Sequence, residues 1–167
     1  MVVYSFFIFD RHAECIYKRQ WPASLTSSSS KETHPTSDPA AVSNGVPGAR
    51  TFTGGADTRL IFGAVYSLRN MTRKLGGEDD RVGSFVCYRT SQYKLHYYET
   101  PTNLKFVMLT DTKTGNMRVA LHQIYVNLYV EYVVKNPLSP VEHPGGIGMY
   151  NELFEESLEQ FVTKVLS

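Results

Sequence analysis

The sequence predicts an α+β domain in which helices cover the faces of one five-stranded, mainly antiparallel sheet. Five short segments have alternating or continuous apolar residues with turn residues between them, at residues 2–9, 14–21, 82–90, 92–100 and 104–111. Three longer segments have apolar residues at helical spacing, at residues 56–77, 114–138 and 150–167. The element order is therefore β-β-α-β-β-β-α-α, and a chain of 167 residues suits one domain over residues 1–167.

The first strand, residues 2–9, is apolar at both odd and even positions. A strand that is apolar on both faces is buried on both, so we expect it in the interior of the sheet. The sequence "DRHAE" supplies the turn to the second strand. Residues 22–55 are then rich in Ser, Thr, Pro, Gly and Ala and poor in large apolar residues, which predicts a disordered insertion before the first helix.

The first helix, residues 56–77, has both of its ends marked in the sequence. Asp57 or Thr58 suits the N-cap, and Gly76 suits a left-handed stop. Five apolar residues at helical spacing are expected to face the core: Ile61, Ala64, Val65, Leu68 and Leu75.

A second stripe follows the same helix on the side away from this predicted core. It consists of Phe62, Tyr66, Arg69 and Arg73. Two aromatic and two arginine side chains are unusual on a solvent face, and both residue types are enriched in protein interfaces. We therefore expect this stripe to bind a partner. The alternative is that the 22–55 segment covers it.

The three later strands are joined by short turns, and Pro101 suits the turn between the last two. Side chains alternate along the strand at residues 92–100, which places Lys94, His96 and Tyr98 on one face. We expect the aromatic residues of this hairpin to pack against helices or a neighbouring subunit and not to form an active site.

The segment at residues 114–138 is rich in Val and Tyr, but its polar residues predict a helix. Gln123, Asn127, Glu131 and Lys135 recur every four residues, which is a helical stripe and not strand alternation. The rest of the perimeter is apolar, so we expect the sheet and a partner to enclose it and the isolated chain to aggregate or need that partner. The last helix is expected to face inward with Leu153, Phe154, Leu158, Phe161, Val162 and Val165.

No pattern in the sequence predicts a catalytic, metal, cofactor or nucleotide site. The five histidines have no metal-ligand spacing with Cys, Glu or another His. Cys15 and Cys87 are interpreted as reduced, buried thiols, because a secreted scaffold would use more cysteines. Cys87 and His96 fall on adjoining strands, where two packed sheet residues are a better interpretation than a nucleophile pair. "HPGGIG", residues 143–148, lacks the Lys-Ser/Thr of a phosphate loop and predicts a flexible connector.

Charge and hydropathy exclude further classes. The formal net charge is +1 and the basic residues are scattered, so charge gives no reason to expect nucleic acid or an anionic membrane as a ligand. The apolar N-terminal "MVVYSFFIF" is short and has neither a basic region before it nor a cleavage site after it, so it predicts a strand and not a signal peptide. We expect no membrane-spanning helix.

Four stretches resemble a known family. "MVVYSFFIFDRHAECIY", "FGAVYSLRNM", "TSQYKLHYYETPTNLKFVMLTD" and "LHQIYVNLYVEYVVKNPL" closely resemble the smallest longin-type core subunits of TRAPP, the transport protein particle, a tethering complex of early secretory traffic. The resemblance covers the N-terminal hairpin and nearly everything from Arg59 onward. The 22–55 segment departs from it and resembles an expansion seen in filamentous fungi.

The resemblance implies a longin fold, also called SNARE-like and related to profilin, in a cytoplasmic protein that is peripheral at Golgi and endoplasmic reticulum membranes. It implies two kinds of partner subunit, a second longin-type subunit and a member of the complex's other fold family. The assembled core is expected to promote guanine-nucleotide exchange on a Rab GTPase, to which this chain contributes surface and no catalytic group or cofactor.

The resemblance also implies where partners bind. In related longin pairs the first helices, here residues 59–75, lie side by side and form a platform for a GTPase. Phe62 and Tyr66 are then the expected anchors of the partner-facing stripe. Lys94, His96 and Tyr98 are further candidates for a contact with the GTPase or with a subunit.

Three other interpretations share this fold. A small clathrin-adaptor chain is the main alternative, and the quoted motifs argue against it. A membrane SNARE would continue into a heptad coiled coil and an anchor, and neither pattern precedes Ser167. An enzyme on a profilin-like scaffold is compatible with the fold, but no predicted site supports it.

Overall fold

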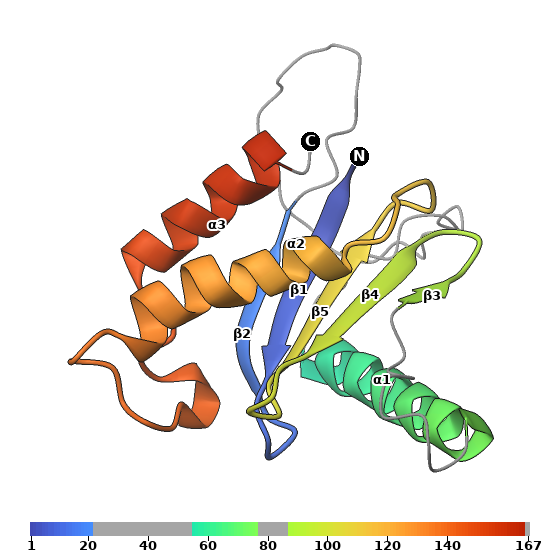
Figure 1. Cartoon of the computed structure of the whole chain (residues 1–167), viewed down its shortest axis with the longest axis horizontal. Helices are drawn as coiled ribbons and strands as arrows, with labels where there is room; N and C mark the ends of the chain where they lie inside the picture. The colour runs from blue at the N-terminus through green and yellow to red at the C-terminus, as the bar shows by residue number, and fades with distance from the viewer. Residues whose placement is uncertain (22–54, 77–86, 166–167) are drawn as a thin grey trace, which may run out of the picture.

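The structure is a computed structural model that describes residues 1–21, 55–76 and 87–165 (Figure 1). In chain order its elements are β1 (Val3–Phe9), β2 (Cys15–Gln20), α1 (Gly55–Gly76), β3 (Cys87–Arg89), β4 (Lys94–Glu99), β5 (Lys105–Thr110), α2 (Arg118–Gln123), η1 (Ile124–Val134), η2 (Pro144–Gly146) and α3 (Glu152–Val165). The predicted insertion falls outside the described residues, apart from Gly55, which begins α1. Residues 82–86 of the predicted third strand also fall outside them.

The five strands form one antiparallel sheet in the order β2-β1-β5-β4-β3. The α+β class and the five-stranded antiparallel sheet are thus confirmed. β1 is an interior strand, as its two apolar faces predict, and β5 beside it is buried along its whole length. The two edges are β2 and β3, and all three residues of β3 are exposed.

A hydrophobic core lies on each face of the sheet. Figure 1 shows α2, η1 and α3 on one side and α1 on the other. The core beneath α2, η1 and α3 receives Phe6, Ile8, Phe106 and Met108 from the two central strands. The core beneath α1 receives Phe7, Phe9, Val107 and Leu109. Alternate residues of β1 and β5 therefore supply opposite cores, as strand geometry requires.

The Val- and Tyr-rich segment is helical, as its four-residue polar spacing predicts. α2 continues into η1, a π-helical run in which the Lys135 N–H donates to the Val130 carbonyl, five residues back, at 2.9 Å. The predicted polar stripe from Gln123 to Lys135 is exposed. Val119, Val126 and Val134 are exposed as well, so the chain's own sheet covers only part of the apolar perimeter, and enclosure by a partner stays a prediction.

The predicted inward faces of the other helices need correction. Ile61 and Val65 are buried and Leu68 is half-buried, but Ala64 and Leu75 are exposed. A helix of 22 residues is about 33 Å long, whereas the strands of six residues span about 20 Å, so the last turns of α1 pass beyond the sheet.

The ends of the helices also differ in detail. α1 ends with Gly76 inside the helix and not as a left-handed stop, and it begins at Gly55, which places the predicted caps Asp57 and Thr58 inside the helix. On α3, Phe154, Leu158 and Val162 are buried, Phe161 is half-buried, and Leu153 is exposed. The side chain of Val165 falls outside the described residues.

The expected flexible connector around "HPGGIG" is instead anchored to the body of the domain. His143 is buried, and its Nδ1 lies 2.8 Å from the carbonyl oxygen of Ile147. The Gly145 N–H donates to Glu14 Oε1 at 2.9 Å. Gly146 has a φ of 83°, and a Cβ there would lie 2.7 Å from the Ile16 carbonyl oxygen. Glycine allows this turn to pack directly on the backbone of β2.

We predict that Gly146→Ala lowers the free energy of unfolding by more than about 2 kcal/mol, since a positive φ costs about 1–2 kcal/mol and a backbone clash adds to it. Gly145→Ala is the matched control, because Gly145 has a φ of 63° and no heavy atom within 4 Å of its Cβ position. Urea unfolding of both variants measures the difference. Equal losses would contradict the packing of Gly146 on β2.

Candidate functional site on helix α1

α1 packs on the sheet through side chains that share one side of the helix. Ile61 and Val65 are buried in the core beneath it. The Phe62 ring lies 5.3 Å from the Phe9 ring, measured between centroids, so this side chain also points to the sheet. Arg69 lies two turns further along the same side. The sheet-facing side of α1 therefore includes two residues of the predicted partner stripe.

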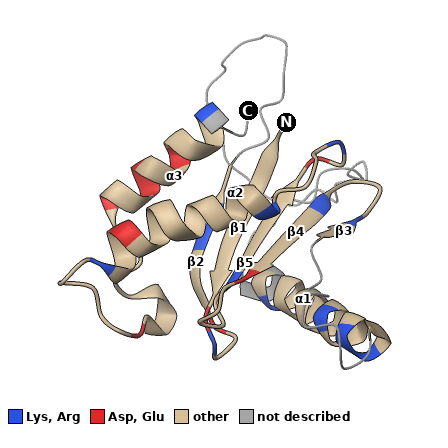
Figure 2. Cartoon of the chain, viewed as in Figure 1, with Lys and Arg blue, Asp and Glu red and all other residues tan. Residues whose placement is uncertain are grey.

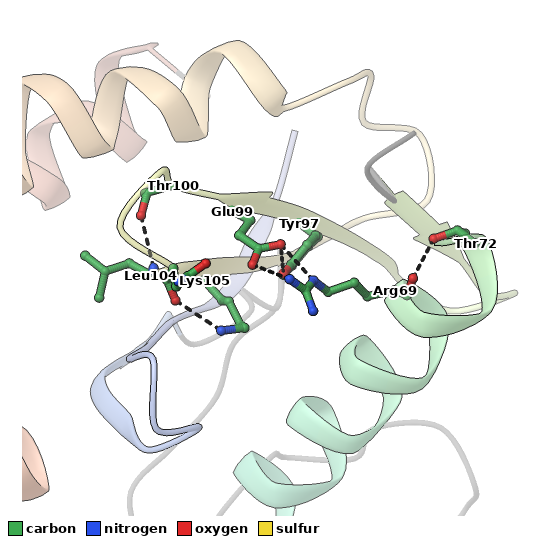
Figure 3. Close-up of polar contacts among 8 residues, drawn as sticks. Arg69, Thr72, Tyr97, Glu99, Thr100, Leu104 and Lys105 are labelled. Carbon is green, nitrogen blue, oxygen red and sulfur yellow. Dashed lines mark hydrogen bonds and ion pairs between the residues drawn. The ribbon is translucent and has the colours of Figure 1, made fainter. Parts of the chain in front are cut away.

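Arg69 forms a two-pronged ion pair with Glu99 at the end of β4 (Figure 3). Nε donates to Oε2 at 2.8 Å and Nη2 donates to Oε1 at 2.7 Å. Both side chains are largely buried, and the Tyr97 hydroxyl donates a third hydrogen bond to Glu99 at 3.1 Å. Burial and the adjacent Glu99 carboxylate raise the pKa of Tyr97, so its hydroxyl remains a donor. Charge-assisted pairs of this geometry fix orientation as well as position.

A second cation lies on the other side of Glu99. Lys105 on β5 lies opposite Glu99 on β4 in the strand register. Its Nζ donates to the Asn103 carbonyl at 3.0 Å. Burial lowers the pKa of Lys105, and the Glu99 charge acts in the opposite direction. Figure 3 shows Arg69 reaching Glu99 from α1 while Lys105 lies in the neighbouring strand.

The structure divides the predicted partner stripe in two. Phe62 and Arg69 face the chain's own sheet, so their expected placement on the non-core side is wrong. Tyr66 and Arg73 are exposed. The Tyr66 ring lies against Phe62 at 5.9 Å between centroids. Phe62 thus supports the exposed Tyr66 from below.

The outer face of α1 carries residues that the sequence analysis did not select. Leu60, Met71 and Leu75 are exposed, with the small residues Ala64 and Ser67 between them at helical spacing. A Cβ at neighbouring Gly63 would meet no described heavy atom within 4 Å, so this face is open. The spacing 60-64-67-71-75 was visible in the sequence. The same helical spacing also fits a core face, and the sequence alone does not distinguish the two sides at Ala64 and Leu75.

Most of the charged residues of α1 are basic. Residues 58–76 contain Arg59, Arg69, Arg73 and Lys74 and no acidic residue. Figure 2 shows basic positions along α1 and several acidic positions on α3. With Arg69 paired to Glu99, three exposed cations border the apolar outer face. This combination suits a protein surface that is apolar at its centre and acidic at its edge.

The second predicted contact set is only partly at the surface. His96 is 1% exposed, its Nε2 lies 3.0 Å from Thr110 Oγ1, and its Nδ1 has no hydrogen-bond partner among the described residues. Burial, with a contribution from the Lys94 charge, lowers the pKa of His96 to about 4, so the ring is neutral. The buried ring offers no contact surface in this structure.

Lys94 and Tyr98 are half-buried and keep their place as predicted contacts. The Lys94 ammonium donates to the Thr114 carbonyl at 2.8 Å. The Tyr98 hydroxyl lies 2.8 Å from His122 Nδ1.

The expectation of two buried thiols is wrong for Cys87, which is exposed, while Cys15 is half-buried. Cys87 lies on the edge strand β3, where no further strand covers it within the described part of the sheet. It faces His96 in register, but no hydrogen bond joins the two side chains among the described residues.

The described residues hold neither a metal-binding cluster nor a membrane-spanning helix. In those ranges, no group of three or more His, Cys, Asp or Glu side chains is arranged to hold a metal ion. None of the described helices has the length and hydropathy needed to cross a membrane.

Comparison with known proteins supplies the family. The sequence profile of the Sybindin-like family matches residues 3–165. The chain belongs to the Sybindin-like family. The predicted longin fold is confirmed by this membership and by the observed sheet and helices.

Similar proteins are found in fungi and animals. "Transport protein particle subunit bet5" of Schizosaccharomyces pombe is 37% identical over 171 residues, covering 97% of this chain and 96% of that protein. "Trafficking protein particle complex subunit 1" of Rattus norvegicus is 35% identical, covering 97% and 92%. "Trafficking protein particle complex subunit BET5" of Saccharomyces cerevisiae is 33% identical, covering 85% and 78%.

We predict that Glu99→Gln lowers the free energy of unfolding by about 1–3 kcal/mol, because it leaves the largely buried Arg69 guanidinium without its counter-charge. Glu131→Gln is the control. It breaks the exposed pair with Lys135 and should cost less than about 0.5 kcal/mol. Urea unfolding measures both, and similar losses would show that the Arg69–Glu99 pair contributes no more than a surface pair.

The buried His96 predicts an acid-dependent loss of stability. Its folded-state pKa of about 4 lies below the unfolded value of about 6.5, so protons bind preferentially to the unfolded chain. Stability is therefore full above pH 6.5 and falls by about 2–3 kcal/mol as pH falls to 4. His96→Gln should flatten this part of the curve in urea melts at stepped pH. An unchanged slope in the variant would contradict the assignment to His96.

Proposed function

We propose that this chain is a non-catalytic core subunit of a transport protein particle complex. Relatives that are 33–37% identical over most of their length carry the names of such subunits. The assembled core is proposed to promote guanine-nucleotide exchange on a Rab GTPase during transport from the endoplasmic reticulum to the Golgi. The chain would then be cytoplasmic and reach those membranes peripherally, through the complex.

The observation that carries the proposal at residue level is the outer face of α1. It presents exposed apolar side chains, Leu60, Met71 and Leu75, on a helix whose residues 58–76 carry only basic charges. Exposed apolar surface with a charged border is the usual composition of a protein interface. The chain would contribute this surface and no reacting group. Exchange of this kind depends on binding the nucleotide-free GTPase better than the loaded one.

The partner of this face is proposed to be the first helix of a second longin-type subunit. Gly63, Ala64 and Ser67 are small, which allows a second helix to approach closely. Tyr66 and Arg73 border the same face and remain proposed contacts, with Phe62 as the support of Tyr66. Phe62 and Arg69 would act through the orientation of α1 and not by direct contact.

Lys94 and Tyr98 are proposed to touch the GTPase or a subunit of the complex's other fold family. They lie on the opposite face of the sheet from α1, where Tyr98 packs beside the α2–η1 core. A partner at these residues would therefore be distinct from the one that covers α1.

We predict that Leu60→Ser/Met71→Ser weakens binding of the second longin-type subunit by at least about tenfold, because loss of central apolar anchors commonly costs 2 kcal/mol or more. Val119→Ser is the matched control, since Val119 on α2 is 68% exposed and Leu60 is 71% exposed. Titration calorimetry measures the affinity, and release of labelled GDP from the Rab measures exchange by the assembled core. Wild-type affinity in the double variant would contradict this use of α1.

A further inference from the structure

The loop between η1 and α3, together with the first turn of α3, displays five large apolar side chains. They belong to Leu138, Val141, Ile147, Tyr150 and Leu153, which we call the loop patch. Leu138 is 91% exposed and Val141 is 99% exposed, more than any other large apolar side chain in the described residues. Clusters of such exposure in a short segment are characteristic of interaction sites.

The loop is held in place although its apolar side chains point outward. Its interior is filled by Met149, which is fully buried, and by His143. The Asn151 amide donates to the Tyr132 carbonyl at 3.2 Å and so ties the end of the loop to η1. A Cβ on Gly148 would lie 2.5 Å from Pro140 Cδ, so the two segments of the loop that contain these residues are in direct contact.

Two further contacts join the loop to the β1–β2 turn and to β2. Arg11 forms an ion pair with Glu142, and the Tyr150 ring packs against Tyr17 at 5.6 Å between centroids. A surface that is already ordered loses little conformational entropy on binding. The loop patch is therefore preorganised for a partner.

The charge beside the loop patch is acidic. Glu152 and Glu156, on the first turns of α3 next to Leu153, are exposed and form no salt bridge with any described cation. Glu14 is exposed and accepts the Gly145 N–H. The basic residues that adjoin the loop, Arg11 and Lys135, are already paired with Glu142 and Glu131. The free charge around the patch is therefore negative, the reverse of α1.

We propose that the loop patch is a second docking surface, for a partner protein whose apolar surface is bordered by Lys and Arg side chains. Leu138 and Val141 are its central anchors, and Glu152 and Glu156 meet the basic border. Complementary charge of this kind favours a basic protein and disfavours an anionic membrane, which would repel the glutamates.

The loop patch and α1 can be occupied together. Figure 1 shows the loop at one end of the molecule, beside β2, and the exposed end of α1 at the other. This inference deepens the proposed function and rests on it for the choice of partner, another subunit of the same complex. It does not rest on the use of α1.

The experiment uses the full chain and each of the other small subunits, purified separately. Leu138→Ser/Val141→Ser should leave the melting temperature unchanged, because both side chains are almost fully exposed. It should weaken binding of one subunit at least about tenfold, while Leu60→Ser/Met71→Ser leaves that subunit's affinity unchanged. Raising NaCl from about 50 to about 300 mM should weaken the same contact, and Glu152→Gln/Glu156→Gln should reduce that salt dependence.

Four results would overturn the inference. Wild-type affinity of Leu138→Ser/Val141→Ser for every subunit would show that the loop patch is not a docking surface. It would leave the proposed function intact. A concentration-dependent self-association in sedimentation that this variant abolishes would make a second copy the occupant. If the wild-type chain floats with phosphatidylserine vesicles and this variant does not, the occupant of the loop patch is a membrane. A wild-type chain that binds none of the subunits would contradict the proposed function itself and the partner assigned here.

Discussion

Two neighbouring strands in the middle of the sheet are apolar on both faces, and the rest of the structure depends on this constraint. β1 and β5 are buried almost throughout, so helices must cover both faces of the sheet to exclude water. α1 covers one face, and α2, η1 and α3 cover the other. A helix that covers a sheet buries one side and leaves the other outside. The covering helices and the loop between them therefore carry most of the large apolar side chains that remain exposed in the described residues.

Burial alone does not determine which side of α1 faces the sheet, because both sides of the helix are apolar. One side offers Ile61 and Val65 with Phe62, and the other offers Leu60 and Met71. The Arg69–Glu99 pair distinguishes the two sides, since only one orientation of α1 about its axis brings the guanidinium to the end of β4. A largely buried ion pair adds little net stability but makes the wrong arrangement costly, because it would leave a charge unpaired. Glu99 thus determines which face of α1 is available to a partner.

This ambiguity explains which features of the structure could be predicted from the sequence. Strand positions and the identity of the α2–η1 helix followed from local patterns, such as the two apolar faces of β1 and the four-residue spacing from Gln123 to Lys135. The outward face of α1 did not, because its choice depends on a contact with Glu99, thirty residues away. The burial of His96 and the anchoring of the 143–148 turn also depend on distant neighbours, Thr110 in one case and Ile16 in the other. A single sequence does not show such contacts.

The central claim is that the outer face of α1 is covered in the assembled complex. Hydroxyl-radical footprinting of the methionines tests it in one experiment, because reaction of a thioether depends on its exposure. Met71 on α1 and Met1 are exposed, whereas Met108 and Met149 are fully buried and serve as unreactive references. The account predicts that Met71 is oxidised in the isolated chain and protected in the complex, while Met1 reacts in both. Equal oxidation of Met71 in the isolated chain and in the complex would contradict it.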